Sequence, residues 1–415
     1  MKLFSLFDKA INSALADGPS DAQTAKADEI CKDVAGGDPK VFEYRFSGAQ
    51  AKLFECTYDV AADSGTIERK TLVKLYNDPD AINFYRMNKN RLNDVVNAYQ
   101  NGGDIGVGAE IYKTYNDGNP YGSLNFAIVQ EFLNGGDLED TTPTDDDIFA
   151  VARLLAKNHL VPYGDTGMNR DFCSQHWPWN TVAYGDHLND DYFKDGRDFV
   201  QGYMQKNGIG DMKTLQEFYE YARDQAEMAP SPAVFSHGDP HLGNIFKLDD
   251  GTYRLLDYDN SNIGPRIWDL IYFWNKLPNT DKDSKFDAYI NAYVTEYNAG
   301  NPPVPVTAAE ISNEFFCHLP YSLLQLAAFY HTMEDLRFLK IDELTLYVMD
   351  LILKDKNFPQ CQAASVPTGA LYADCEFEAK SNDVQMKVTN KGGNGGSDAR
   401  EYSLALGLLF LSIFR

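Results

Sequence analysis

The sequence predicts an α+β fold with two lobes, a small antiparallel β-sheet followed by a mostly helical part. Between residues 41 and 132, short runs of alternating aromatic and β-branched residues are separated by turn-forming residues. After Gly136 the apolar residues recur at helical spacing instead. Strand and helix patterns do not alternate along the chain, which disfavours a parallel doubly wound sheet.

The β-rich part begins at Val41 with VFEYRFSGAQAKLFECTYDVA, which predicts two strands joined by a turn at Ser47–Gly48. The segment ERKTLVKLYN (68–77) predicts a third strand. Residues 81–100 are polar with spaced apolar positions and predict one helix. GAEIYKTYNDGNPYGSLNFAIVQEFLNGG predicts two more strands around an Asn-Asp-Gly turn and ends at Gly135–Gly136.

The helical part begins with TDDDIFAVARLLAKNHLVP, where an acidic start, an apolar stripe and a final proline predict a helix. DMKTLQEFYEYARDQAEMAP repeats this design. A hairpin follows, with NIFKL and TYRLLDYD on either side of the turn at 249–251. Further helices are predicted at about 266–276, 284–298, 307–338 and 341–354.

The organisation along the chain is predicted to comprise four segments: a helical and loop extension (1–35), the sheet lobe (36–133), the helical lobe (134–355) and a flexible tail (356–415). The leading segment MKLFSLFDKAINSALADG favours an amphipathic helix over a signal peptide, because Asp8 and Lys9 interrupt its apolar run. The tail ends in an apolar run at 403–414, shorter than the roughly 20 residues that span a membrane. We expect this run to pack on the protein or to touch a membrane surface.

The charge and the cysteines limit the functional classes. A formal net charge of -24 argues against binding nucleic acid through a basic surface. The six cysteines form no CxxC pair, which excludes the common zinc-ribbon and thioredoxin patterns. We expect reduced thiols in a cytoplasmic enzyme, with a local Cys361–Cys375 disulfide as the alternative.

The stretch VFSHGDPHLGNIF (234–246) allows two interpretations of its polar residues. His237, Asp239 and His241 stand at alternate positions and could ligate a metal, as in a zinc or di-metal hydrolase. The other histidines form no matching cluster in the sequence, so further ligands for such a site are missing.

The second interpretation is phosphoryl transfer, which needs a base, magnesium ligands and a cation for the phosphates. Asp239 can act as the base, and the amide of Asn244, five residues later, suits Mg²⁺. Asp257 ends the following strand and offers a hard oxygen ligand. Lys74 lies in an otherwise apolar strand, and the turn at Ser47–Gly48 allows its backbone to approach phosphates. The order of these features along one chain favours this interpretation.

The chain resembles the choline/ethanolamine kinase and aminoglycoside phosphotransferase superfamily, whose fold is protein-kinase-like. FSHGDPHLGNIF is similar to its catalytic loop, and SGAQAKLFECTYD and TLVKLYND resemble its first hairpin and third strand. RLLDYDNSNIGPRIWDLIYFWN resembles the choline/ethanolamine kinase segment in which an acidic strand end precedes an aromatic helix; its polar residues here are Asp257, Asp259, Asn262, Arg266 and Asp269. The resemblance covers about residues 40–355.

The resemblance implies a role for each matching position, with ATP and Mg²⁺ as cofactors. Asp239 would be the catalytic base, and Asn244 and Asp257 would hold Mg²⁺ with the assistance of Asp259. The nucleotide-binding set would be Gly48, Lys74, Gln130, Glu131, Phe132 and Asn244. Residues 36–133 would then form the nucleotide-binding lobe, and 134–355 the catalytic and acceptor-binding lobe. His237 is expected to brace the catalytic loop by hydrogen bonds.

Two departures from the family pattern bear on substrate and activity. The loop has His-Gly-Asp, which is common among aminoglycoside-type members, whereas choline kinases usually have Asn in the middle. The helix expected to supply a glutamate for Lys74 has none, since no Glu lies between Asp80 and Glu110. On this helix Asp94 is the acid that could substitute.

The acceptor is expected to be an amino alcohol, because aromatic faces together with a carboxylate bind a quaternary ammonium. The candidates are Asp269, Trp268 and Tyr272, and Trp274, Tyr321 and Tyr330 follow in later helical positions with Glu334 and Asp335 nearby. Core packing is the alternative explanation for each aromatic residue.

The sequence therefore predicts a kinase of choline or ethanolamine that makes phospholipid head-group precursors. A kinase of another small hydroxyl compound, of the aminoglycoside phosphotransferase type, stays open. So do a nucleotide-binding pseudokinase, tethered to a membrane through 403–414, and the metal hydrolase. The oligomeric state is not predicted.

Overall fold

The computed structural model describes residues 18–47, 51–62, 65–76, 89–115, 126–139, 141–161, 194–277, 282–332, 339–355, 359–364, 377–378 and 385–386. The chain divides into two compact units, each built from several segments. The first comprises Met1–Asn169, Asp239–Ser261 and Lys276–Lys282, and the second comprises Arg170–Gly238, Asn262–Asn275 and Asp283–Arg415. The four contiguous segments predicted from the sequence stay a prediction beside this division.

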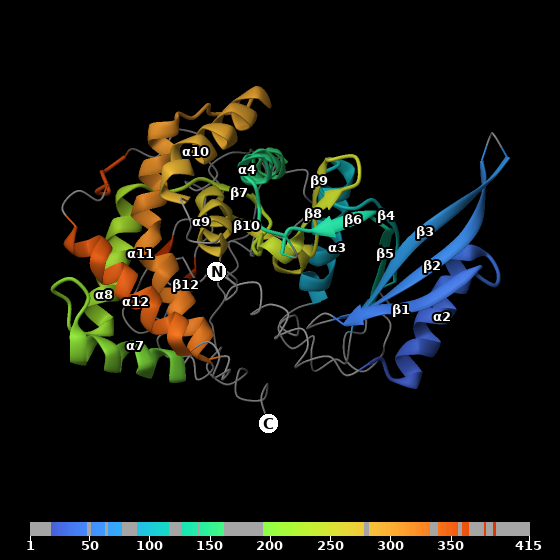
Figure 1. Ribbon diagram of the computed structural model, residues 1–415, viewed down its shortest axis with the longest axis horizontal. Coiled ribbons are helices and arrows are strands. Elements are labelled where there is room, and N and C mark those ends of the chain that lie inside the picture. The colour runs from blue at the N-terminus through green and yellow to red at the C-terminus, as the bar shows by residue number, and fades with distance from the viewer. Residues whose placement is uncertain are drawn as a thin grey trace. The chain divides into compact units, whose positions relative to one another are not determined.

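The first unit contains a five-stranded antiparallel sheet, as the alternating pattern predicts (Figure 1). Its strands are β1 (Val41–Ser47), β2 (Ala51–Ala62), β3 (Gly65–Tyr76), β4 (Ile111–Tyr115) and β5 (Ala127–Glu131), and their order in the sheet is β1-β2-β3-β5-β4. β3 lies at the centre, where Lys74 pairs with Leu53 on one side and with Ile128 on the other. The central position of β3 buries its second half on both faces.

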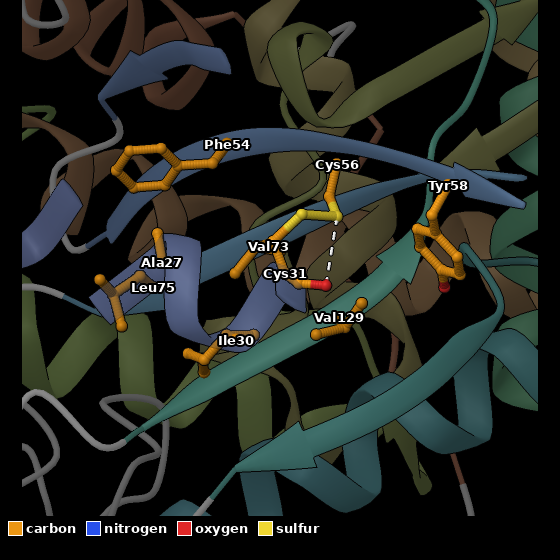
Figure 2. Packing of buried hydrophobic residues seen from close by; sticks show 10 residues of the cluster. Ala27, Ile30, Cys31, Phe54, Cys56, Tyr58, Val73, Leu75 and Val129 are labelled. Carbon is orange, nitrogen blue, oxygen red and sulfur yellow. Dashed lines mark hydrogen bonds between the residues drawn. A yellow bond between two sulfur atoms is a disulfide. The ribbon is translucent and has the colours of Figure 1, made fainter. Parts of the chain in front are cut away.

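Helix α2 (Asp21–Ala35) covers one face of this sheet (Figures 1 and 2). Ser20 caps the helix in a capping box with Gln23, and Gly36 ends it in the left-handed conformation. Ala27 and Ile30 pack against alternate residues of the strands, which include Phe54, Val73 and Leu75. Because side chains alternate along a strand, Lys74 and Tyr76 must point to the opposite face.

The opposite face carries the elements that hold the candidate site. Helix α3 runs from Lys89 to Asp104, and α4 runs from Asp145 to His159. A three-stranded sheet joins β6 (Gly135–Asp137), β8 (Ile245–Leu248) and β9 (Tyr253–Leu255), and two 3₁₀ turns flank the β8–β9 hairpin, η4 (Leu242–Asn244) and η5 (Tyr258–Asn260). The helix predicted at 81–100 is confirmed from Lys89 onward, and residues 77–88 lie outside the described residues.

The second unit is mostly helical, as predicted. Its helices are α7 (Lys194–Asn207), α8 (Leu215–Met228), α9 (Arg266–Lys276), α10 (Lys282–Ala299), α11 (Ala308–Thr332) and α12 (Leu339–Lys354). The central helix is α11, which packs against α7, α8 and α12. Two strand pairs complete the described part of this unit: β7 (Ala233–Ser236) with β10 (Asn262–Pro265), and β11 (Phe377–Glu378) with β12 (Gln385–Met386).

Two disulfides contradict the expectation of reduced thiols. Cys31 of α2 is bonded to Cys56 of β2, with 5.8 Å between their Cα atoms (Figure 2). Cys317 of α11 is bonded to Cys361, with a Cα separation of 4.8 Å. Cys361 therefore has a partner other than the predicted Cys375, which lies outside the described residues. The sequence prediction was wrong because residues distant along the chain meet only in the folded state.

In the part of the chain that the structure describes, no helix has the length and apolarity to cross a membrane. The predictions for the leading segment and for the apolar run at 403–414 fall outside the described residues.

Candidate active site

The site in the first unit is built around Lys74, whose ammonium lies on the face of the sheet away from α2. Lys74 Nζ donates hydrogen bonds to Asp257 Oδ1 at 2.7 Å, to Asp259 Oδ2 at 2.8 Å and to the hydroxyl oxygen of Tyr99 at 2.6 Å. Burial alone would lower the pKa of Lys74, but the two carboxylates outweigh it and raise the pKa above its ordinary value. Lys74 is therefore held as a charged group.

Asp257 and Asp259 reach Lys74 from one tight turn after β9. Asp257 adopts a left-handed backbone conformation, with φ of 60°, which is uncommon for a residue with a side chain. The 3₁₀ turn η5 starts immediately afterwards. This reversal places both carboxylates on the lysine although only one residue separates them.

The aromatic residue between the two aspartates anchors the turn on α3. Tyr258 is buried, and its hydroxyl donates to Asn158 Oδ1 of α4 at 3.3 Å. A Cβ atom at Gly102 of α3 would lie 2.4 Å from the Tyr258 ring, and one at Gly108 would lie 2.9 Å away. The absence of side chains at these two positions lets the ring approach the helix closely.

The loop that contains Asp239 and Asn244 is tied to the same turn by its backbone. Asn244 Nδ2 donates to the Asp239 carbonyl oxygen at 2.9 Å, which turns the amide oxygen of Asn244 away from the loop. The Leu256 N–H donates to the Asn244 carbonyl oxygen at 2.8 Å. These two bonds connect the predicted base, Asp239, with the predicted metal ligands Asn244 and Asp257 through adjacent backbone.

His241 supports this loop, as the 3₁₀ turn η4 requires a cap at its start. Its Nδ1 accepts a hydrogen bond from the Gly243 N–H at 3.1 Å, and its Nε2 lies 4.0 Å from Asp239 Oδ2. Within the described ranges, no group of three or more His, Cys, Asp and Glu side chains could hold a metal ion. The hydrolase interpretation therefore finds no cluster in these ranges.

The residues just before Asp239 belong to the second unit, where Asp269 of α9 braces them. Asp269 is fully buried, and its oxygens accept from Ser236 Oγ at 2.9 Å, the His237 N–H at 2.7 Å and the Gly238 N–H at 2.9 Å. An ionised carboxylate that is buried needs such donors. Asp269 was predicted to contact the acceptor, which stays a prediction; in the structure its oxygens accept hydrogen bonds from residues 236–238.

Arg266, which precedes Asp269 in the segment that resembles choline/ethanolamine kinases, has a structural role. Its guanidinium donates to Glu314 of α11 through two nitrogens, and Glu314 also accepts from Ser231 Oγ at 3.0 Å. All three side chains are buried. Burial would lower the pKa of Arg266, but Glu314 raises it, so the pair stays charged.

The predicted nucleotide-binding segment at the end of β5 is described in part. The Glu131 N–H donates to the Glu110 carbonyl at 2.8 Å, and the Phe132 N–H donates to the Lys70 carbonyl at 3.4 Å. Gln130 is buried, and among the described residues its Oε1 has no hydrogen-bond partner. This oxygen can receive a hydrogen bond from a ligand. Gly48, the remaining predicted member, lies outside the described residues.

The predicted acceptor aromatics separate into exposed and buried groups. Trp268 and Tyr272 are one turn apart on α9, are partly exposed, and have ring centroids 5.6 Å apart. Trp274 and Tyr321 are buried in the core of the second unit, as the alternative explanation proposed. Nothing is described for the side chain of Tyr330 or for Glu334 and Asp335.

Known proteins resemble this chain both in sequence and in structure. The model of the phosphotransferase enzyme family, APH, matches residues 101–303. No curated protein sequence matches the chain. Among solved structures, the choline kinase of Cryptosporidium parvum Iowa II has a TM-score of 0.52 at 13% identity, over 79% of this chain and 94% of that one.

Two further solved structures are similar at comparable identity. APH(2")-IIia, in its complex with GDP and kanamycin, has a TM-score of 0.50 at 10% identity, over 76% of this chain and 94% of that one. An ethanolamine kinase of Plasmodium vivax has a TM-score of 0.48 at 15% identity, over 74% and 82%. At TM-scores of 0.50 and above, the first two structures confirm the protein-kinase-like fold class that the sequence predicts.

Proposed function

We propose that this chain, whose residues 101–303 match the model of the phosphotransferase enzyme family, is an ATP-dependent kinase that phosphorylates a hydroxyl group of a small molecule. The observation that supports this most strongly is the bonding of Lys74 to Asp257, 183 residues later in the chain. A lysine and a hard oxygen ligand brought together in this way serve the phosphates and the metal of a nucleotide.

The residues of the first unit suffice for the parts of phosphoryl transfer that the protein must supply. Lys74 would orient the phosphates of ATP. Asn244 and Asp257 would hold Mg²⁺, since their oxygens are hard ligands and the Asp257 side chain is 45% exposed. When bound, Mg²⁺ supplies positive charge that offsets the negative charge developing on the phosphoryl oxygens.

Asp239 would accept the proton of the acceptor hydroxyl. Its side chain is partly exposed, and its backbone is fixed from both sides by the Asn244 side chain and by the His241 N–H, which donates to the Asp239 carbonyl at 2.9 Å. A base in a fixed loop is oriented before the acceptor arrives, which is the main contribution that a kinase makes to this reaction.

For the acceptor, we propose choline or ethanolamine, and hence a place in the supply of phospholipid head-group precursors. Trp268 and Tyr272 support this proposal because they offer neighbouring, partly exposed aromatic faces suited to an ammonium group. The Asp269 oxygens accept hydrogen bonds from Ser236 and from the His237 N–H, so the support for an amino alcohol comes from the two aromatic faces. Aminoglycosides are the competing class, as the His-Gly-Asp sequence of the loop indicates.

The test is ADP release from ATP and Mg²⁺ with choline, ethanolamine and a panel of aminoglycosides. We expect turnover with an amino alcohol, and a loss of about 10²–10⁴-fold in Asp239→Asn, since the base is removed. Asp250→Asn is the matched control, because Asp250 is an exposed aspartate in the β8–β9 turn. This control should retain turnover.

Three outcomes separate the alternatives. Turnover with aminoglycosides alone would keep the kinase and overturn the amino-alcohol proposal. ATP binding without turnover above the Asp239→Asn level, for every acceptor, would indicate a nucleotide-binding pseudokinase. If the purified protein contained zinc and did not bind ATP, the metal-hydrolase interpretation would be favoured.

A further inference from the structure

Lys74 lacks the partner that a kinase lysine usually has. In protein kinases a glutamate on the helix beside the sheet forms an ion pair with this lysine. Helix α3 contains no glutamate, and the side chain of Asp94, the predicted substitute, lies outside the described residues. From α3, Tyr99 contacts the lysine instead, with its hydroxyl oxygen 2.6 Å from Nζ. Among the described side chains, the carboxylates that reach Lys74 are those of Asp257 and Asp259, which follow β9.

Asp259 is placed to provide that carboxylate, because it is sealed within the cluster. Its Oδ2 lies 2.8 Å from Lys74 Nζ, and its side chain is 3% exposed. Asp257 also lies on Lys74, but its side chain is 45% exposed. Of the two aspartates, Asp257 can therefore offer an oxygen to a metal at the surface, whereas Asp259 cannot do so without moving.

The second oxygen of Asp259 is occupied by two tyrosine hydroxyls. Tyr76 donates to Oδ1 from the same face of β3 as Lys74, and Tyr99 donates to it from α3 at 2.9 Å. Three donors from a strand and a helix thus converge on one buried carboxylate. Tyr99 connects the cluster further, since its oxygen accepts from Lys74 while its proton is directed at Asp259.

We propose that Asp259, held by Tyr76 and Tyr99, is the permanent counter-charge of Lys74 and fulfils the role of the absent helix glutamate. Asp259 is then a positioning residue and not a magnesium ligand, which revises the metal set to Asn244 and Asp257. Asp257 would hold Mg²⁺ together with Asn244 when Mg-nucleotide is bound, and Asp259 would hold the lysine toward the phosphates. This inference rests on the proposed function of the same site.

The test is a double-mutant cycle between Asp259→Asn and Lys74→Ala, read by calorimetric binding of ADP in EDTA and in MgCl₂. We expect Asp259→Asn to weaken ADP binding about 10–100-fold under both conditions, as loss of a charge-assisted bond would. In the Lys74→Ala background the same substitution should change binding less than about twofold, because Asp259 acts through the lysine. Asp257→Asn should weaken binding more in MgCl₂ than in EDTA, because it would lose a metal ligand as well as its bond to Lys74.

The matched controls are substitutions in a second cluster of a lysine, a tyrosine and an aspartate in the same unit. Asp33 of α2 accepts from Lys113 Nζ at 2.6 Å and from the Tyr115 hydroxyl, on the sheet face that α2 covers. Asp33→Asn and Tyr115→Phe should leave ADP binding unchanged. Tyr99→Phe, which keeps the ring and removes the hydroxyl, should weaken ADP binding about 3–10-fold with KM for ATP rising accordingly. Thermal unfolding of each variant confirms that it is folded.

The inference is overturned if Asp259→Asn raises the Mg²⁺ concentration needed for half-maximal turnover while binding in EDTA is unchanged, which is the behaviour of a metal ligand. It is also overturned if the effects of Asp259→Asn and Lys74→Ala are additive. If the Asp259→Asn variant does not fold, the same cycle between Tyr99→Phe and Lys74→Ala tests whether the cluster acts through Lys74; additive effects would then overturn the inference.

Failure of the proposed function gives a different result. If the wild type turns over no acceptor but binds ADP, the kinase proposal fails and the cycle still tests Asp259. If the wild type does not bind ADP, both fail together.

Discussion

The buried lysine of β3 shows what residue-level reasoning can and cannot reach. From the sequence, Lys74 was assigned to the phosphates of ATP, with Asp94 as the acid that could pair with it; in the structure Asp257 and Asp259 lie on its ammonium group. The identity of the partner depends on the backbone at Asp257, where a left-handed residue turns the next two side chains back. The sequence DYD does not specify that turn. Tyr99 was missed for a similar reason, since a tyrosine in a helix is usually interpreted as core.

The structure gives Asp269 hydrogen-bond partners that sequence reasoning did not predict. The pattern of an aspartate followed by aromatics suggested an acceptor site, but the aspartate and the aromatics lie on different sides of α9. Asp269 is buried and accepts from residues 236–238, whereas Trp268 and Tyr272 are partly exposed. Helical spacing separates neighbours in sequence by about 100°, so adjacent residues seldom share a ligand.

At the residue scale, His318 should make the protein sensitive to acid. Burial lowers the pKa of His318 to about 4, although its ring contacts the Ala229 carbonyl oxygen. In the unfolded chain His318 takes up a proton near pH 6.5, whereas in the folded state it does so only near pH 4. The free energy of unfolding is therefore unaffected by His318 above pH 6.5 and decreases as the pH drops toward 4. We expect a loss of about 1–2 kcal/mol in the free energy of unfolding between pH 7.5 and pH 5 from this group.

Urea unfolding of the wild type and of His318→Gln at the two pH values measures this contribution. Gln can still donate to the Ala229 carbonyl but does not titrate, so the variant should lose less stability on acidification. An equal loss in both proteins would show that His318 is not the source.

At the element scale, the first sheet, the β8–β9 hairpin and most of the helices were predicted, whereas helix α7 and the β7–β10 pair were not. The five strands of the first sheet and the four helices between residues 266 and 354 were predicted from periodicity and have their expected types. The β7–β10 pair was missed because each strand has four residues and its partner is not adjacent in the chain. The packing of α2 on the sheet was missed as well, since a helical pattern does not say which surface it will cover.

In helix α3, one substitution should have opposite effects on stability through helix propensity and through packing. Gly102→Ala should raise helix propensity, but the new Cβ would lie 2.4 Å from the buried ring of Tyr258. Since that ring is fixed between α3 and Asn158, we expect a destabilisation of about 1–3 kcal/mol and weaker ADP binding, because Tyr258 lies between the two site aspartates.

The matched control is Gly202→Ala in α7, where a Cβ would meet nothing within 4 Å. There the same substitution should stabilise the protein by about 0.5–1 kcal/mol. Thermal unfolding of the two variants compares them directly. Stabilisation by Gly102→Ala would mean that Tyr258 yields, and that it does not anchor the turn.

At the scale of the whole molecule, the compact units do not follow the order of the chain. The Asp239–Ser261 hairpin belongs with the first unit, although the chain on both sides of it belongs to the second. Sequence patterns locate elements but not their tertiary partners, so contiguous segments were the natural prediction. The placement of Asp257 beside Lys74, however, could be anticipated from the order of the motifs and their resemblance to a known family.

The two disulfides should contribute strongly to stability. Each closes a loop within one unit, across 25 and 44 residues. Removing either should cost about 2–4 kcal/mol. We expect Cys31→Ala/Cys56→Ala to weaken ADP binding as well, because α2 supports the sheet that carries Lys74. Cys317→Ala/Cys361→Ala should destabilise the protein with ADP binding retained.

Thermal unfolding with and without dithiothreitol, together with a count of free thiols, measures both effects. Unchanged unfolding on reduction, with all six thiols reactive before treatment, would show that the bonds do not form. If both disulfides are confirmed, an oxidising compartment would be favoured over the predicted cytoplasm, because disulfides persist in oxidising compartments.

The pairing of the cysteines also affects how the chain is made. The four bonded cysteines, of six in the chain, could be joined to one another in three ways, and the observed pairing keeps each bond within one unit. During synthesis Cys31 and Cys56 emerge long before Cys317, so the first pair can close while its competitors do not yet exist. We therefore expect translation to favour the native pairing, whereas refolding of the reduced full-length chain would allow all six cysteines to compete at once.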